Sequence, residues 1–110
     1  MILFEDGAIS LTRGDTAYLS LNLTTNDGEP YEFHDGDTVT LTVKRTYDDV
    51  EDYLFQKTIP AGDTFVIEPQ DTKQYEYGRY IYDVQVNTAI GEVFTVIGPD
   101  TFKLTKEATL

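Results

Sequence analysis

The sequence predicts an all-β domain, a sandwich of two antiparallel sheets with about seven to nine strands and an immunoglobulin-like architecture. Short runs of alternating apolar and polar residues recur along the chain, separated by turns rich in glycine, proline and aspartate. No segment sustains the 3.6-residue apolar period of a helix, so the crossover helices that a parallel sheet needs are missing. The chain contains no cysteine, and we expect residues 1–110 to form one domain that depends on its core, without a disulfide.

The clearest strand covers residues 78–87, where ten positions alternate behind an initial glycine. Successive side chains of a strand point to opposite faces. One face of this segment is apolar, and we expect it to be the core face of a central strand. That face consists of Tyr80, Tyr82, Val84 and Val86.

Residues 16–24 and 38–45 alternate almost as clearly, and each is expected to form a long, half-buried strand. Weaker patterns predict further strands at residues 2–4, 8–12, 53–59, 64–68, 92–97 and 101–106, with a short extended segment at 31–33. Turn residues separate them at 5–7, 26–28, 34–37, 60–63, 88–91 and 98–100. One helical turn is predicted at residues 69–74, because proline suits the first position of a helix.

The charge balance restricts the partners. The chain has 20 acidic and 8 basic residues, a net charge of −12. The basic residues are scattered, so no basic stripe can neutralise a phosphate backbone, and direct nucleic-acid binding is not expected. The acidity suits basic partners, including proteins that normally hold nucleic acid. Residues 1–4 are too short for a signal-peptide core and no run of about 18 apolar residues occurs, so we expect neither export nor membrane insertion.

Two acidic segments, residues 35–37 and 48–52, resemble fragments of calcium-binding loops. The calcium-loop pattern fails after the first segment, because position 39 is valine and no glutamate follows in register. We therefore expect both segments to be solvated acidic turns, and we predict no metal site.

Catalytic candidates are equally few. His34 is the only histidine, Ser10 and Ser20 are the only serines, and neither serine lies in a nucleophile-elbow motif. We predict no catalytic and no cofactor site, and we expect His34 to be a surface turn residue. The absence of tryptophan leaves no strong sugar platform, and the eight tyrosines fall mostly on strand faces. Residues 75–82 partly resemble the tyrosine corner of immunoglobulin-like domains, with Tyr82 where those domains carry cysteine.

Several strand and turn motifs occur together, at residues 12–16, 36–44, 56–57, 71–72, 77–83, 94–97 and 102–107. Taken together they resemble small structural proteins of tailed phages and prophages of Gram-positive bacteria, particularly the N-terminal domain of the siphophage baseplate upper protein. The resemblance covers roughly residues 9–109. It implies a β-sandwich that docks on the tail or baseplate, and longer members of the family continue into a segment that carries host-binding proteins. The shared positions mainly build the fold, so they transfer no binding residue.

We therefore expect a non-enzymatic structural or assembly protein that is made in the host cytoplasm and placed in the virion tail or baseplate. Its expected partners are distal tail or baseplate components, with a homo-oligomer as a further option. Charges at residues 44–45 and 103–106 are expected to guard open sheet edges. Two alternatives remain: an acidic decoy that inhibits a nucleic-acid-binding host protein, and a carbohydrate-binding β-sandwich module.

Overall fold

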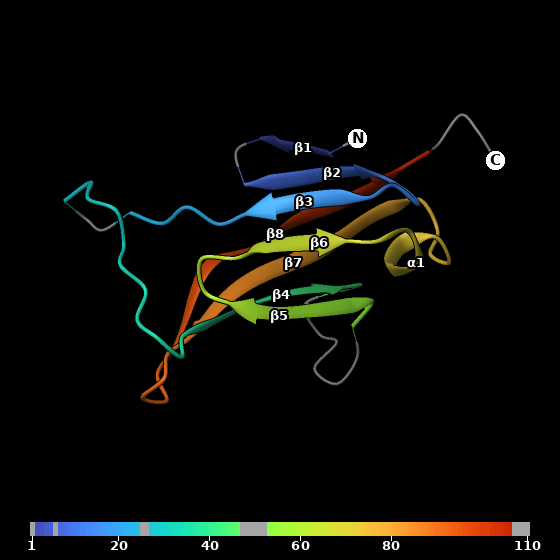
Figure 1. Cartoon of the computed structure of the whole chain (residues 1–110). Coiled ribbons are helices and arrows are strands. Elements are labelled where there is room, and N and C mark those ends of the chain that lie inside the picture. Colours follow the sequence, from blue (N-terminus) through green and yellow to red (C-terminus); the bar gives the residue numbers. More distant parts are fainter. Residues whose placement is uncertain (1, 6, 25–26, 47–52, 107–110) are drawn as a thin grey trace.

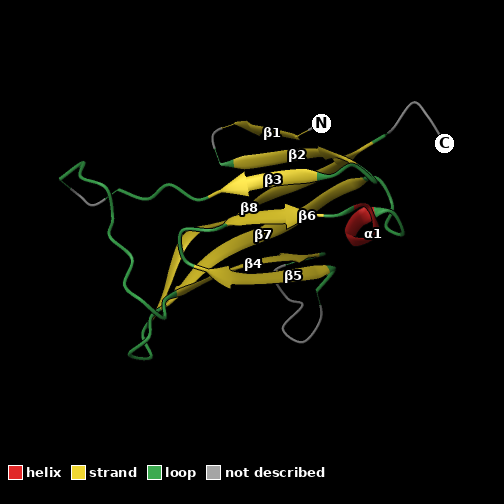
Figure 2. Cartoon of the chain, in the orientation of Figure 1, coloured by secondary structure: helices red, strands yellow, loops and turns green. Residues whose placement is uncertain are grey.

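A computed structural model describes residues 2–5, 7–24, 27–46 and 53–106, and it consists mainly of β-strands (Figures 1 and 2). The strands are β1 (Ile2–Glu5), β2 (Ala8–Thr12), β3 (Ala17–Ser20), β4 (Thr38–Lys44), β5 (Phe55–Pro60), β6 (Thr64–Ile67), β7 (Gly78–Asn87) and β8 (Val93–Thr105). One helical turn, α1 (Pro69–Thr72), precedes β7. The prediction of an all-β class is confirmed, and so is the helical turn behind Pro69.

The strands form two layers of unequal size. The larger sheet has six strands in the order β1-β2-β8-β7-β4-β5, and the smaller sheet pairs β3 with β6. Figure 2 shows the small sheet lying over the middle of the large one. Every ladder is antiparallel except that of β2 with β8, which is parallel and departs from the predicted antiparallel arrangement.

The core lies between the layers and is centred on β7. The predicted core face is confirmed, since Tyr80, Tyr82, Val84 and Val86 are all buried. The neighbouring strand β4 adds Val39, Leu41 and Val43, and the small sheet closes over them with Ala17, Phe65 and Ile67. The alternation of residues 78–87 therefore positioned the central strand correctly.

The long strand predicted at residues 16–24 is wrong in length. The strand β3 ends at Ser20, because its only ladder partner, β6, is itself four residues long. The predicted apolar face continues beyond it, since Leu21 and Leu23 stay half-buried against the core. The chain then runs out as a long loop to the start of β4, seen at the left of Figure 1, and residues 31–33 form no strand.

The two strands predicted at residues 92–97 and 101–106 are one strand, β8, with an irregularity in its pairing to β7 where the turn was expected. Gly98 allows the backbone of β8 to lie close to that of β7 at this point. It has a φ of +86°, and a Cβ atom there would lie 2.6 Å from the carbonyl oxygen of Tyr82. A side chain at position 98 would therefore push β8 away from the central strand.

We expect Gly98→Ala to destabilise the fold well beyond the cost of a left-handed alanine, which is about 1–2 kcal/mol. Gly62→Ala is the matched control, because Gly62 has a similar φ of +94° but open space around its Cβ position. Urea denaturation of both variants measures the difference. Equal losses of stability would show that the contact with Tyr82 is unimportant.

Buried tyrosines tie the strands to distant loops. Tyr80 donates a hydrogen bond to the carbonyl oxygen of Glu76 at 2.7 Å, and Tyr75 donates one to that of Leu54 at 2.9 Å. Tyr82 reaches the carbonyl of Gly7 at the edge of the sheet. Burial, with the negative charge of Asp100, raises the pKa of Tyr82 to about 12. The Tyr82 phenol therefore stays a protonated donor throughout the physiological range.

Tyr80→Ala should cost about 3–5 kcal/mol of unfolding free energy, because it empties a buried aromatic site. Tyr80→Phe should cost only about 0.5–1.5 kcal/mol, through loss of the bond to Glu76. The exposed neighbour Arg79→Ala provides the control and should change stability by less than about 0.5 kcal/mol. Chemical denaturation that ranks Arg79→Ala above Tyr80→Ala would reverse the assignment of the two faces of β7.

Candidate protein interaction site

The acidic turn before β4 is a structural element. Asp37 is buried, and its carboxylate accepts hydrogen bonds from the backbone N–H of His34 at 2.9 Å and of Ala89 at 3.0 Å. The carbonyl of Asp37 also accepts from the N–H of Ala61. One residue thus joins the loop before β4 to the β7–β8 hairpin and to the turn after β5.

The expectation of a solvated turn is correct for Asp35, which is exposed, and wrong for Asp37. The two backbone N–H groups hold the pKa of the Asp37 carboxyl below its usual value. The second acidic segment, residues 48–52, lies outside the described residues. Within the described part of the chain, no group of three or more histidine, aspartate or glutamate side chains is arranged to hold a metal ion.

The few catalytic candidates lie on separate elements. His34 is exposed in the turn before β4, as expected of a surface residue. Ser20 ends β3, where its hydroxyl shares a hydrogen bond with that of Thr64 on β6. Ser10 lies on β2, opposite Lys103 of β8. Among the described residues, no hydrogen bond links His34 to either serine, and the Ser20 bond is a cross-strand contact within the small sheet.

Three of the motifs that carry the resemblance, at residues 12–16, 71–72 and 77–83, meet beside α1, whereas the motif at residues 94–97 lies on β8 at the other end. The guanidinium of Arg13 lies over the ring of Tyr77, 4.1 Å from its centroid, and donates to the Tyr77 hydroxyl at 3.0 Å. Next to it, the backbone N–H of Gly14 donates to the hydroxyl of buried Thr72. These positions build the fold at this end of the molecule, which leaves the opposite end to be considered for binding.

That opposite end has an open sheet edge on β8. The strand β8 pairs with β7 along its length but with β2 only over Phe102–Thr105. Among the described residues, no strand pairs with the outer edge of β8 over residues 93–97. The predicted edge guards are not there: Lys44 ends a central strand, and Lys103 lies where β2 already covers β8.

Apolar side chains gather at this edge. Phe94 pairs with buried Val86 and so shares its inner face, yet it is 46% exposed because the small sheet does not reach it. Val93 points to the outer face and is 57% exposed, and Ile90 in the hairpin turn is 83% exposed. The edge is therefore apolar on both faces.

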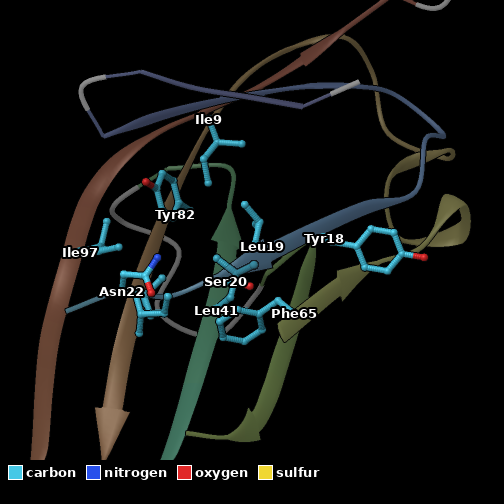
Figure 3. Close-up of a pocket in the computed structure, with 11 residues that line it drawn as sticks. Ile9, Tyr18, Leu19, Ser20, Asn22, Leu41, Phe65, Tyr82 and Ile97 are labelled. Atoms are coloured by element: carbon cyan, nitrogen blue, oxygen red, sulfur yellow. The ribbon is translucent and has the colours of Figure 1, made fainter. Parts of the chain in front are cut away.

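A pocket of about 350 Å³ lies between the layers beside this edge (Figure 3). Its walls are mainly apolar and include Leu41 and Val84 from the large sheet and Phe65 from the small one. Ile97 of β8 and Asn22, beyond the end of β3, also line it. The pocket lies under the end of β3 and the residues that follow it, since Leu19, Ser20 and Asn22 line it from above.

Two acidic segments adjoin this end. Residues 27–37 have five carboxylates, residues 83–100 have three, and neither segment has a lysine or arginine. The eight basic residues lie elsewhere in the sequence: Lys44 lines a small pocket together with Asp83, and Lys57 forms an ion pair of 2.8 Å with Asp71 of α1. We call the β8 edge at residues 93–97, Ile90 and the pocket, with these acidic segments, the open end.

Four of the tyrosines are held by contacts within the domain. Tyr75, Tyr80 and Tyr82 donate to backbone carbonyls, and Tyr77 lies under Arg13. The predicted packing role of these residues is therefore what the structure shows.

The helical turn α1 has four residues, and within the described part of the chain no helix could span a membrane.

No protein family model, curated protein or solved structure matches the chain. The open end is consequently defined by its own geometry. The sequence analysis predicted open sheet edges at the charges of residues 44–45 and 103–106. The sequence feature that could have located the open end is the apolar segment 93–97, which has no lysine and is followed by a glycine and a proline.

Asp37→Asn should lower the melting temperature at pH 7, because an amide presents an N–H₂ group to one of the two backbone donors. The folded pKa of Asp37 lies below the ordinary 3.8, so the carboxylate stabilises the fold above that pH, and its contribution is lost as pH falls through the folded pKa. The gap between variant and wild type should therefore shrink on acidification from pH 7 to about 3. Asp35→Asn, in the same turn but exposed, is the control and should show little change at either pH. A gap independent of pH would contradict the role given to the carboxylate.

Proposed function

We propose that this protein is a non-enzymatic structural or assembly module of a tailed phage or prophage, which docks in the tail or baseplate through protein–protein contacts. The observation that carries the proposal is the open end, where an unpaired strand edge, exposed apolar side chains and an apolar pocket occur together. Soluble domains expose contiguous apolar surface mainly where they bind something.

The tail or baseplate assignment is supported by the sequence resemblance. Its motifs at residues 12–16, 71–72 and 77–83 meet at the α1 end, in contacts such as that of Arg13 with Tyr77. The motif at residues 94–97 lies on β8 in the open end itself, so the resemblance also includes the proposed docking surface.

An immunoglobulin-like arrangement is the finer fold that we propose. Its support is the bond from the Tyr80 hydroxyl to the carbonyl of Glu76, four residues upstream, which has the form of a tyrosine corner. Tyr82 follows two residues later and is buried where immunoglobulin domains place a cysteine. The division into six and two strands is less even than in immunoglobulin domains.

The acidic decoy is the second candidate, because the open end has eight carboxylates in two segments without a lysine or arginine. Such a surface could occupy the basic groove of a nucleic-acid-binding host protein. It differs from the docking proposal in location: a decoy stays in the infected cell, whereas a tail module is part of the particle.

Purified particles of the phage that encodes the chain should contain it, and mass spectrometry of the particles should detect it together with distal tail or baseplate proteins. Ile90→Ser should lower its incorporation while leaving its melting temperature unchanged, because Ile90 is 83% exposed. Loss of one apolar contact of about 1–2 kcal/mol would weaken docking roughly 5–30-fold.

Val66→Ser is the control, because Val66 is also an exposed apolar residue, at 37%, but lies on β6 in the small sheet and does not line the pocket. It should be incorporated like the wild type. A chain absent from particles and co-purifying with a host nucleic-acid-binding protein would replace the docking proposal with the decoy.

A further inference from the structure

We propose that the edge of β8 at residues 93–97 accepts an added β-strand from a partner protein, and that this strand is an extended segment in which basic residues alternate with apolar ones. The inference rests on the proposed docking function and names its surface and its partner. Three observations support it: the orientation of the edge backbone, the uncovered inner face, and the charge of the open end.

The backbone of the edge is directed outward for pairing. The N–H of Thr88 donates to the carbonyl of Glu92 at 2.8 Å, so position 92 faces β7. Hydrogen-bonding groups alternate along an antiparallel pair, which turns the N–H and C=O groups of Val93 and Thr95 away from β7. The N–H and C=O groups of these two residues, four groups in all, are therefore available to a new strand.

The regular part of the edge, residues 93–95, lacks the features that normally prevent pairing. Edge strands are usually protected by lysine, proline or a bulge within the exposed stretch. In β8, the pairing irregularity begins after Thr95, because Thr95 and Ile97 pair with the adjacent residues Gln85 and Val84, and Pro99 lies beyond it. These features limit regular pairing to the start of the open stretch, and β2 occupies the same side of β8 farther along.

The β5 edge is different. This strand lies at the opposite margin of the large sheet, ends in Pro60, and holds Lys57 in an ion pair with Asp71. Both features discourage an additional strand. Of the β5 edge and the open stretch of β8, only the latter is apolar and without lysine or proline; β1, at the other margin of the sheet, is a separate edge.

The inner face gives an added strand something to cover. Phe94 faces inward and is 46% exposed, and Ile97 lines the pocket (Figure 3). A strand beside β8 would direct every second side chain to this same face. Apolar residues at those positions would pack on Phe94 and reach the mouth of the pocket, as happens in strand addition to other open sheets.

The charge identifies the partner and argues against a second copy. A new strand would run beside Glu92, next to the hairpin to which Asp37 bonds the acidic segment of residues 27–37. Two copies paired through this edge would bring these carboxylates together, which is repulsive. Lysine or arginine at the outward positions of a foreign strand would be attracted instead, and the attraction would weaken with salt.

The test uses a labelled peptide of alternating lysine and β-branched residues, KIKVKIKVK, added to the full chain. Thr95→Pro removes one outward N–H and keeps the charge of the protein. Because this N–H does not face β7, proline is compatible with the fold at this edge. Fluorescence anisotropy should show binding to the wild type that is weakened at least about tenfold in Thr95→Pro, the equivalent of roughly 1.4 kcal/mol.

Two controls separate pairing from simple charge attraction. Thr95→Val keeps the N–H and should bind like the wild type. Thr58→Pro makes the same change on the β5 edge and should also bind the peptide like the wild type. The N–H of Ala61 faces β4, where it donates to the carbonyl of Asp37. N–H groups alternate along the strand, so the N–H of Thr58 faces the open side of β5. The acidic peptide EIEVEIEVE should not bind. Equal affinity of Thr95→Pro and wild type would overturn the inference.

A second measurement applies if Thr95→Pro fails to fold. Amide hydrogen exchange of the wild type, followed by NMR, should slow at Val93 and Thr95 when KIKVKIKVK is added. Unchanged exchange at saturating peptide would overturn the inference. These results are separable from the docking proposal: a chain found in particles but unprotected at Val93 and Thr95 would dock by another surface, whereas a protected edge in a chain absent from particles would belong to a different complex.

Discussion

Burial of one face of β7 against two short strands is the interaction on which the rest of the molecule depends. Tyr80, Tyr82, Val84 and Val86 supply most of the contact surface of the central strand, and the small sheet closes over them with Phe65 and Ile67. Two strands of four residues each can cover only the middle of a six-stranded sheet. The covered part is the core, and the uncovered part is the open end.

The loops compensate for this small cover. The carboxylate of Asp37 holds the loop before β4 to the β7–β8 hairpin, and the hydroxyl of Tyr82 reaches the backbone of Gly7 on the far side of β8. At the other end, Arg13 and Thr72 fasten the β2–β3 connection to α1. Polar side chains thus do at the margins what apolar packing does at the centre, because a domain without disulfides has no covalent alternative.

Charge and shape coincide at the open end. An apolar edge would promote self-association in a neutral protein. Here the surrounding carboxylates oppose pairing between copies while leaving the edge available to a basic strand. The position of the acidic residues therefore says more about the partner than the net charge of −12 does, since the segments 21–37 and 83–100 contain no lysine or arginine.

The sequence by itself determined the β class, the core face of β7, the turn at α1 and the motifs of the α1 end, because these follow from local alternation and turn chemistry. The tertiary structure alone decided the end of β3 at Ser20, the union of two predicted strands into β8, the burial of Asp37 and the parallel pairing of β2 with β8. Each of these depends on which segments meet in space. A strand ends where its partner ends, and a carboxylate is buried only where distant backbone donors converge on it, and neither fact is written in the local pattern of residues.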